Sequence, residues 1–294
     1  MNLRTHLHRL FNRADSSNKD LLVSLLIMAW VVEARDPYTG GHLWRVSRYA
    51  HRLSTALGMS PAEVARVTIG GFLHDLGKVG IPDHILNKKD RLTDEEYEVI
   101  RTHPDVGWRM LAGHPLAYIA ENAIRSHHEM PNGRGYPQGL AAGDIPRDAL
   151  IVGVCDAFDA MTSTRPYRKG MPIEKALAII ESELGKQFDA EIGAHFIRLG
   201  RLGEWDHIVG HTDLGIPLQV CGNCGPTIVV RREQRHGEHV YCRSCSTEFV
   251  TQHQAGQLTL SPTGRSGQAK DVEPLADLAL IARLLDDAKA ILAA

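Results

Sequence analysis

Histidine and aspartate residues cluster between positions 42 and 156 of this chain, and together they are suited to binding divalent metal ions. The candidates come from five segments: His42, His74 and Asp75, His103, His127 and His128, and Asp156. Imidazoles combined with carboxylates favour Mn, Fe, Ni or Zn, whereas oxygen ligands alone would favour Mg or Ca. The pattern therefore predicts a metal site, and a helical bundle can hold two metals when such ligands face its core.

The dipeptide His74-Asp75 is weak evidence for a metal site when it is taken alone. A histidine in such a pair more often caps a helix or lies hydrogen-bonded in the core, and the aspartate more often forms an ion pair. On a regular helix their side chains point about 100° apart and reach one metal only if it lies close to the helix. Two further carboxylates have open roles. Glu129 is expected to accept a histidine N–H, and Asp159 to order Lys78 or a ligand, or to cap its helix.

Two Cys-x-x-Cys pairs form a second metal-binding pattern near the C-terminus. The four residues are Cys221, Cys224, Cys242 and Cys245. Four thiolates in two knuckles are typical of a structural zinc site, and metal binding would allow a small β module with little core to fold. Redox dithiols are the alternative, but no thioredoxin-like βαβ pattern surrounds either pair. We predict one structural zinc in a module over residues 217–251.

Helical patterning dominates the chain from Lys19 to about Leu199. We predict a helical domain over residues 19–205, preceded by an N-terminal extension over residues 1–18. A capping box begins a helix at Thr93, and Pro172 begins another that ends before Gly185. The apolar run over residues 21–32 is shorter than the roughly 18 to 20 residues that a spanning helix needs, so we predict a buried helix and no membrane span.

The C-terminal third has a different pattern. Short β-like runs over residues 227–230 and 238–241 lie between the cysteine pairs. Residues 252–273 are rich in Gly, Ser, Thr and Gln, which predicts a flexible linker. Residues 274–294 have the apolar spacing of a helix that docks on either domain or on a partner. The fold class is therefore mainly α, with a small β module and a C-terminal helix.

The composition is that of a soluble globular protein. The 294 residues are 43% hydrophobic and 23% charged, and the net charge of -2 provides no general attraction for nucleic acid. A local group of basic residues near the cysteines is explained more simply as a solvated rim, so nucleic-acid binding is not expected. Without a signal peptide pattern, and with cysteines spaced as metal ligands, we predict a cytoplasmic protein.

The order of these motifs resembles the HD-GYP subgroup of HD-domain phosphohydrolases, which are bacterial phosphodiesterases for cyclic di-GMP. The resemblance extends from about Glu33 to Arg168, and the helices up to about Leu199 also fit it. The matching segments are ARDPYTGGHLWRV, HDLGKVGIPDHIL, HPDVG, HHEMPNGRGYPQGL and DAFDAMTSTRPYR. The resemblance implies an HD-domain helical bundle followed here by the zinc-ribbon-like module.

The resemblance also implies the chemistry. Cyclic di-GMP would be hydrolysed to pGpG, and onward to GMP, by a hydroxide that two metal ions, Fe or Mn, activate. The seven implied metal ligands are His42, His74, Asp75, His103, His127, His128 and Asp156, with Asp75 bridging the two ions. Asp75 and Lys78 would be catalytic, because the ammonium of Lys78 would stabilise charge on the phosphate oxygens.

Substrate binding is implied for two further segments. Arg165 and Arg168 would contact phosphate or a guanine edge, because a guanidinium matches paired acceptors. The loop residues Gly135, Tyr136 and Pro137 would shape substrate access, and in the family this loop is associated with docking to diguanylate cyclase domains. We expect that domain or another signalling protein as a partner, and leave homodimerisation open.

The sequence departs from the family at two places. Asn132 replaces the usual acidic residue, and Tyr38 stands where some members have a glutamate that binds a third metal, so we predict two metals. The alternatives are a non-hydrolysing cyclic di-GMP receptor or adaptor, and a phosphodiesterase for another cyclic dinucleotide such as cyclic GMP-AMP. The presence of both Asp75 and Lys78 argues against a receptor, whereas base selectivity depends on the shape of the pocket.

Overall fold

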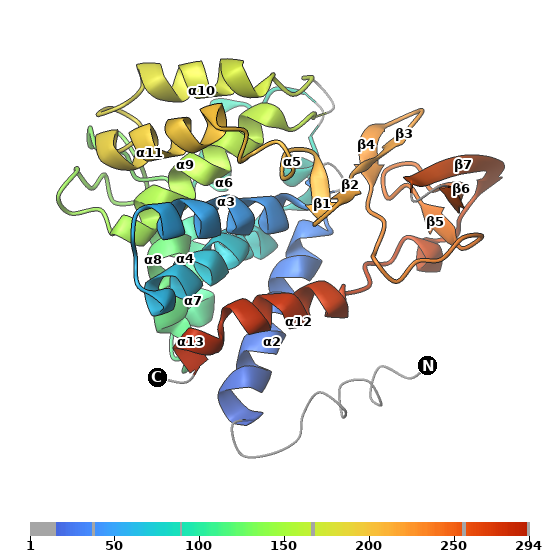
Figure 1. Ribbon diagram of the computed structural model, residues 1–294, viewed down its shortest axis with the longest axis horizontal. Coiled ribbons are helices and arrows are strands. Elements are labelled where there is room, and N and C mark those ends of the chain that lie inside the picture. The colour runs from blue at the N-terminus through green and yellow to red at the C-terminus, as the bar shows by residue number, and fades with distance from the viewer. Residues whose placement is uncertain (1–15, 37–38, 89, 166–167, 255–256, 293–294) are drawn as a thin grey trace.

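The computed structural model describes residues 16–36, 39–88, 90–165, 168–254 and 257–292. Figure 1 shows a bundle of helices beside a smaller group of strands, and a final helix that returns to the bundle. The predicted fold class, mainly α with a small β region, is confirmed. The helices before the strands are α2 (Ser16–Glu33), α3 (His42–Ala56), α4 (Pro61–Leu73), η1 (Leu76–Gly80), α5 (Asp83–Leu86), α6 (Asp94–Ile100), α7 (His103–Leu111), η2 (Ala117–Ile119), α8 (Glu121–Ser126), α9 (Arg147–Thr162), α10 (Ile173–Ser182) and α11 (Ala190–Arg201).

Local sequence signals explain where several helices begin. The hydroxyl of Thr93 accepts the backbone N–H of Glu96, whose side chain accepts the N–H of Thr93, so the predicted capping box is confirmed. Ser60 and Glu63 form a second capping box before α4. Pro172 lies immediately before α10, as predicted, because its fixed φ suits a helix entry.

Buried aromatic rings hold α3 against α9 and α11. The ring centroid of Tyr49 lies 5.4 Å from that of Phe158 and 5.4 Å from that of Trp205, in edge-to-face arrangements. Phe196 completes the cluster, 5.0 Å from Phe158. Edge-to-face pairs of this kind add to the stabilisation from apolar burial. The cluster therefore fixes α3 and α9, the two helices that supply His42 and Asp156.

The apolar run over residues 21–32 lies within α2 and is largely buried. Leu22 and Leu26 are completely inaccessible, in the same core as α3 and α4. The prediction of a buried helix is confirmed. Within the described residues, no helix combines the length and apolarity needed to cross a membrane.

The strands form three small antiparallel sheets. They are β1 (His211–Asp213) with β2 (Ile216–Pro217), β3 (Gln219–Cys221) with β4 (Gly225–Ile228), and β5 (His239–Tyr241) with β6 (Thr247–Gln254) and β7 (Gln257–Ser266), where β6 is central. Their shared core is small and consists largely of Ile228, Val230, Val240, Phe249 and the cysteines. A module with so little apolar surface needs a further source of stability.

The prediction of a flexible linker over residues 252–273 was wrong. Residues 252–254 extend β6, and β7 pairs with it, for example Thr251 opposite Leu260 and His253 opposite Leu258. Leu258 and Leu260 alternate along β7 and pack against the core of the strand region. The polar composition concealed this short alternation, and threonine itself favours strands.

The C-terminal helix docks on the helical bundle. It comprises α12 (Leu278–Asp287) and α13 (Lys289–Leu292), and α12 begins after Asp277, whose carboxylate accepts the N–H of Leu280 at 2.8 Å. Leu284 is 2% exposed and belongs to the same core as α2. Arg48 on α3 forms an ion pair with Asp287 at 2.6 Å. The sequence left three docking surfaces open for this helix, and in the structure the helix docks on the helical bundle.

We expect Leu284→Ala to lower the free energy of unfolding by about 2–5 kcal/mol, because it removes buried methyl groups between α12 and the bundle. Leu275→Ala is the matched control, since Leu275 is 63% exposed. Urea unfolding followed by far-UV circular dichroism measures both. Equal, small effects of the two substitutions would contradict the docking of α12.

Candidate metal centre

His42 is the first residue of α3, and the chain before it is held closely. Gly41 adopts a φ of 77° as the residue before the helix. A Cβ at this position would lie 2.7 Å from the Cα of Thr212, so glycine is required by space as well as by conformation. The N–H of Leu43 donates to Glu33 Oε1 at 2.8 Å, which satisfies one unpaired donor of the first turn.

His74 and Asp75 lie where α4 ends and η1 begins, rather than within one regular helix. His74 follows the last residue of α4, and Asp75 precedes the 3₁₀ turn of η1. His74 Nε2 lies 3.4 Å from Asp75 Oδ2. The 100° separation expected for neighbours on a regular helix therefore does not limit this pair.

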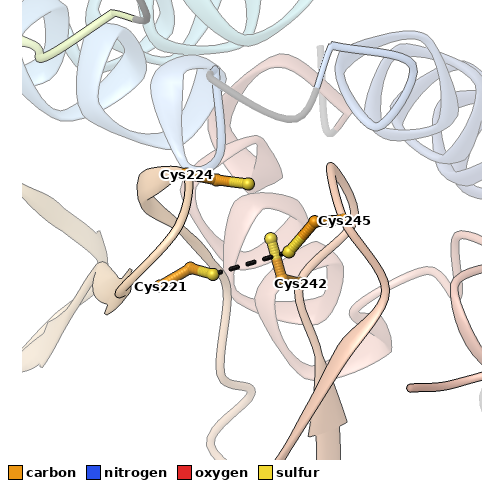
Figure 2. A group of neighbouring side chains, drawn as sticks. All are labelled: Cys221, Cys224, Cys242 and Cys245. Carbon is orange, nitrogen blue, oxygen red and sulfur yellow. Dashed lines mark hydrogen bonds between the residues drawn. The ribbon is translucent and has the colours of Figure 1, made fainter. Parts of the chain in front are cut away.

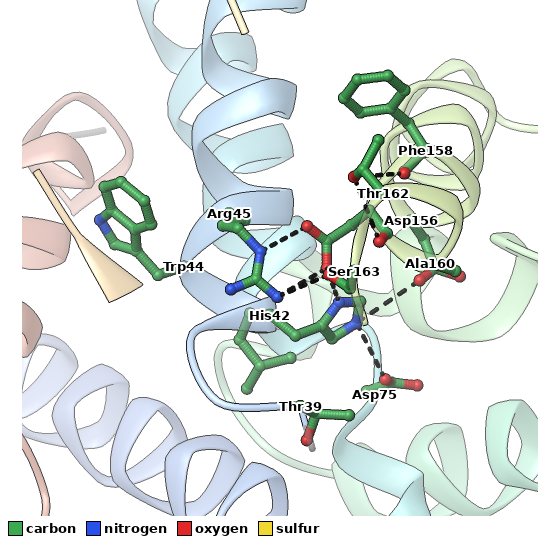
Figure 3. Close-up of polar contacts among 12 residues, drawn as sticks. Thr39, His42, Trp44, Arg45, Asp75, Asp156, Phe158, Ala160, Thr162 and Ser163 are labelled. Atoms are coloured by element: carbon green, nitrogen blue, oxygen red, sulfur yellow. Dashed lines mark hydrogen bonds and ion pairs between the residues drawn. The ribbon is translucent and has the colours of Figure 1, made fainter. Parts of the chain in front are cut away.

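The tertiary structure brings all seven predicted metal ligands together from distant segments. Three groups of ligand atoms each lie within 4.8 Å of one another: His42, His74 and Asp75; His103, His127 and His128; and His74, His127 and Asp156. Figure 3 shows His42 between Asp75, Asp156 and the end of α9. The predicted convergence of five segments is thus observed in the geometry.

Asp75 lies between two histidine groups. Its Oδ2 atom is 3.4 Å from His42 Nε2, and its Oδ1 atom is 3.5 Å from His103 Nε2. The two oxygens of one carboxylate thus face different sets of imidazoles. This is the arrangement that a bridging carboxylate between two cations requires.

Helix ends orient three of the imidazole rings. Nδ1 of His74 lies 2.8 Å from the carbonyl oxygen of Gly71, and Nδ1 of His127 lies 2.7 Å from that of Ala123. His103 makes the same contact with a carbonyl at the end of α6. Carbonyls in the last turn of a helix accept the Nδ1–H, which leaves Nε2 free to bind a metal.

The Nε2 atoms are close enough to require a cation. Nε2 of His103 lies 3.2 Å from Nε2 of His127, and Nε2 of His42 lies 3.4 Å from Nε2 of His74. Two imidazole lone pairs at this distance repel each other unless a proton or a metal ion lies between them. Imidazole nitrogens and carboxylate oxygens also form a suitable donor set for a borderline divalent metal, so the residues fit a metal centre.

Asp159 orients His42 and is itself held by a buried arginine. Its Oδ2 atom lies 2.8 Å from His42 Nδ1, and Arg45 donates to both carboxylate oxygens at 2.6 and 3.0 Å. Arg45 and Asp159 are each 1% exposed. Of the roles that the sequence left open for Asp159, the structure has the ordering of a histidine.

Charge and burial favour the metal-binding protonation states of His103, His128 and Asp75. Burial lowers the pKa of His103 to about 4 and that of His128 to about 3, which keeps these imidazoles neutral. Burial opposes ionisation of Asp75, but Lys78 and His74 outweigh it and lower the pKa of this carboxyl group. Burial likewise opposes the charged form of His42, yet Asp159 and Asp75 raise its pKa to about 9, so this position attracts a cation.

Lys78 connects the metal centre to a neighbouring cleft. Its Nζ atom lies 2.6 Å from Asp75 Oδ2, and the residue also lines a cleft of about 780 Å³. Arg165 and Tyr97 line the same cleft. Arg168 instead donates to the carbonyl of Ala160 at the end of α9. The geometry therefore associates Lys78 and Arg165 with the cleft, and it holds Arg168 against the helix.

The loop of Gly135, Tyr136 and Pro137 covers one side of the centre. The ring of Tyr136 stacks on His128 with centroids 4.6 Å apart, and Arg101 lies over the same tyrosine ring. A Cβ at Gly135 would lie 2.4 Å from the Cα of Glu129, so only glycine fits. The loop thus contacts a predicted metal ligand directly.

The role expected for Glu129 was wrong. Its carboxylate oxygens accept the backbone N–H groups of Gln138 at 2.7 Å and Leu140 at 2.9 Å, rather than a histidine N–H. A buried carboxylate that accepts two backbone donors holds a loop in a single conformation. The sequence did not reveal this contact, because nothing local pairs position 129 with positions 138 and 140.

Two residues important for the geometry, Glu33 and Arg45, were missed from the sequence. For Arg45 a signal was available. Arg45 follows His42 by three residues and Asp159 follows Asp156 by three, so the two residues of each pair lie on one helix face. Tyr38, on which the prediction of two metals rather than three depends, lies outside the described residues.

The four predicted cysteines form a cluster away from the histidines. Figure 2 shows Cys221 and Cys224 on one strand connection facing Cys242 and Cys245 on another. Their sulfur atoms lie within 4.8 Å of one another, and Cys221 Sγ is 3.7 Å from Cys245 Sγ. All four are free thiols. The cluster has the ligand number and type of a closed structural zinc site.

The family follows from a comparison with known proteins. Residues 27–192, more than half of the chain, match the family model described as HD domain. This range contains all seven predicted histidine and aspartate ligands. The protein belongs to the HD domain family, and the resemblance predicted from its motifs is confirmed.

Curated relatives share this part of the chain. A cyclic di-GMP phosphodiesterase of Thermotoga maritima is 40% identical over 184 residues, which cover 62% of this chain and 50% of that protein. The cyclic di-GMP phosphodiesterase response regulator RpfG of Xanthomonas campestris is 36% identical, covering 64% of this chain and 50% of that protein. The 3'3'-cGAMP-specific phosphodiesterase 3 of Vibrio cholerae is 36% identical, covering 55% and 35%. The chain spans half the length, or less, of these relatives.

We expect Asp159→Asn to weaken metal binding about 10- to 100-fold, because the amide cannot balance the charge of Arg45 while orienting His42. Asp148→Asn is the matched control, since Asp148 is also buried on α9 and pairs with an arginine, Arg66, away from the centre. Mn(II) titration followed by electron paramagnetic resonance measures both affinities. Equal weakening in the two variants would refute the orienting role.

We expect Glu129→Ala to raise the KM for substrate while the number of bound metals stays unchanged, because the loop over His128 loses two charged hydrogen bonds, each worth about 1.5–3 kcal/mol. Glu129→Gln retains one acceptor oxygen and is expected to lie between the variant and the wild type. Steady-state kinetics with metal analysis distinguishes the two effects. Loss of metal with an unchanged KM would contradict this assignment.

Proposed function

We propose that the protein is a metal-dependent cyclic dinucleotide phosphodiesterase that hydrolyses cyclic di-GMP to linear pGpG, and onward to GMP. The observation that supports this most is the position of Asp75, whose two oxygens face separate histidine groups. His42, His74 and Asp156 would hold one cation with Asp75, and His103, His127 and His128 the other. Fe or Mn suits this donor set.

The bound cations would lower the pKa of water and neutralise charge on the phosphodiester. The protein's own residues position the reactants. Asp75 and the oriented imidazoles hold the centre rigid, so little reorganisation is needed during the reaction. Lys78, anchored on Asp75 and open to the cleft, would place its ammonium beside a non-bridging phosphate oxygen. Addition of one water breaks one P–O bond and gives pGpG, and a second hydrolysis gives GMP.

The cleft supports a dinucleotide substrate. Its volume of about 780 Å³ is within the range of ligand sites, and Lys78 and Arg165 bring positive charge to it. Cyclic di-GMP has two phosphodiester groups, one of which would lie at the metals. Arg165 would contact phosphate or a guanine edge. Arg168, which donates to a carbonyl of α9, would hold the segment that carries Arg165 against this helix.

A second candidate substrate is cyclic GMP-AMP, and the relative from Vibrio cholerae named for that substrate favours testing it. A non-hydrolysing receptor is less favoured, because the full ligand set and Lys78 are brought together. We also propose one structural zinc on the four cysteines, in a module that includes the β6–β7 hairpin. The cytoplasmic location, dimerisation and docking of a diguanylate cyclase domain at the Tyr136 loop stay predictions.

We expect Asp75→Asn to abolish hydrolysis and to lose most metal from both histidine groups, because one neutral amide cannot bridge two cations. Asp144→Asn is the control, since Asp144 is exposed. An anaerobic assay with Mn- or Fe-loaded protein, cyclic di-GMP and cyclic GMP-AMP resolves pGpG from GMP, while metals per chain are counted. Wild-type turnover in Asp75→Asn would refute the mechanism, and tight binding without product in the wild type would favour the receptor.

A further inference from the structure

The strand region packs directly against the segment that leads into His42. A Cβ added at Gly40 would lie 2.7 Å from Val229 Cγ2 and 3.3 Å from Leu218 Cδ1. Val229 follows β4, and Leu218 lies between β2 and β3. Figure 1 shows these strands beside the ends of α2 and α3. The loop before His42 is therefore enclosed, and part of its enclosure comes from outside the helical bundle.

A second contact comes from the cysteine knuckle itself. Arg243 lies between Cys242 and Cys245, and its guanidinium carbon is 5.1 Å from the ring centroid of Trp30 on α2. A guanidinium over a tryptophan face is held by electrostatic attraction that strengthens as water is excluded. The knuckle thus has a specific side-chain partner on the helical bundle.

Glu33 shares a cavity with Arg243 and accepts a hydrogen bond from the first turn of α3. It lies one helical turn after Trp30, and it lines the same small enclosed cavity as Arg243, Gly40 and Gly41. Burial raises the pKa of Glu33, and the hydrogen bond from Leu43 and the positive charges of Arg45 and Arg243 oppose this rise. Glu33 in turn accepts the N–H of Leu43, the residue after His42. Arg243 and Glu33 thus face one cavity, and the hydrogen bond to Glu33 comes from the first turn of α3.

We infer that the cysteine module is a positioning element of the metal centre, acting on His42 through Arg243 and Glu33 and through the packing of Val229 on Gly40. This inference rests on the proposed metal-dependent function. If this inference holds, a displacement of the cysteine knuckle changes the position of His42, so the module contributes to the geometry of the metal centre. Arg243 and Val229 are positioning residues, since neither touches the centre itself.

A compensating pair of substitutions tests the packing contact. Gly40→Ala introduces a methyl group that collides with Val229, and we expect it to weaken Mn(II) binding at the histidine centre about tenfold, which is typical of a displaced ligand support. Val229→Ala alone removes this packing without introducing a collision, so we expect it to weaken Mn(II) binding less than Gly40→Ala does. The double variant should recover most of the affinity, because the collision is removed. No recovery in the double variant would overturn the packing route.

Substitutions of Arg243 test the electrostatic route. We expect Arg243→Ala to weaken Mn(II) binding several-fold and Arg243→Lys to restore part of the loss, since lysine retains the charge. Arg235→Ala is the matched control on the same module, because Arg235 is exposed and its hydrogen bonds among the described residues use its backbone. Zinc content of the cysteine cluster, measured in each variant, verifies that the module is folded. An unchanged Mn(II) affinity in Arg243→Ala would overturn this route.

The same preparations are assayed for cleavage of cyclic di-GMP, which separates the two proposals. If the wild type cleaves the substrate and none of the variants changes Mn(II) affinity, the positioning inference is wrong and the proposed function stands. If the affinities change as expected but the wild type cleaves no cyclic dinucleotide, the proposed function is wrong and the positioning inference stands.

Discussion

The metal centre depends above all on the buried ion pair between Arg45 and Asp159. Removing two charges from water costs several kcal/mol for each ion, and apolar residues of similar size often stabilise a fold as well or better. Stability alone therefore does not explain the pair. Its geometry does, because Asp159 orients the Nδ1 side of His42 while Arg45 also donates to the carbonyls of Gly40 and His211. One interaction thus joins α3, α9 and β1 at the first predicted metal ligand.

The remaining histidines use helix ends for the same purpose. His74 and His127 each follow the last residue of a helix, and their Nδ1 atoms hydrogen-bond to backbone carbonyls of its last turn. The Nε2 atoms are then forced towards one another at distances that are unfavourable without a cation. The surrounding aromatic and aliphatic core holds the helices in place despite this local repulsion between Nε2 atoms.

The C-terminal third is integrated with the helical bundle rather than attached to it by a flexible chain. Asp213 on β1 accepts from Arg232, which follows β4, and from Arg283 on α12. This carboxylate is 2% exposed, so it ties the strand region and the final helix together in a partly dehydrated environment. The strand region and α12 are therefore joined directly, and α12 is packed in the core of the helical bundle.

The sequence by itself determined the helical class, the capping box at Thr93, the ligand types and the two cysteine pairs, because these depend on local spacing or on the chemistry of single side chains. Tertiary structure decided which groups meet. Arg45 and Asp159 are 114 positions apart, and Glu129 and Leu140 meet only through the shape of a loop. The β6–β7 hairpin is stabilised by packing against a small core, and its polar composition does not predict this packing. Contacts between residues that are distant in the sequence depend on how the whole chain packs, and local sequence patterns do not specify that packing.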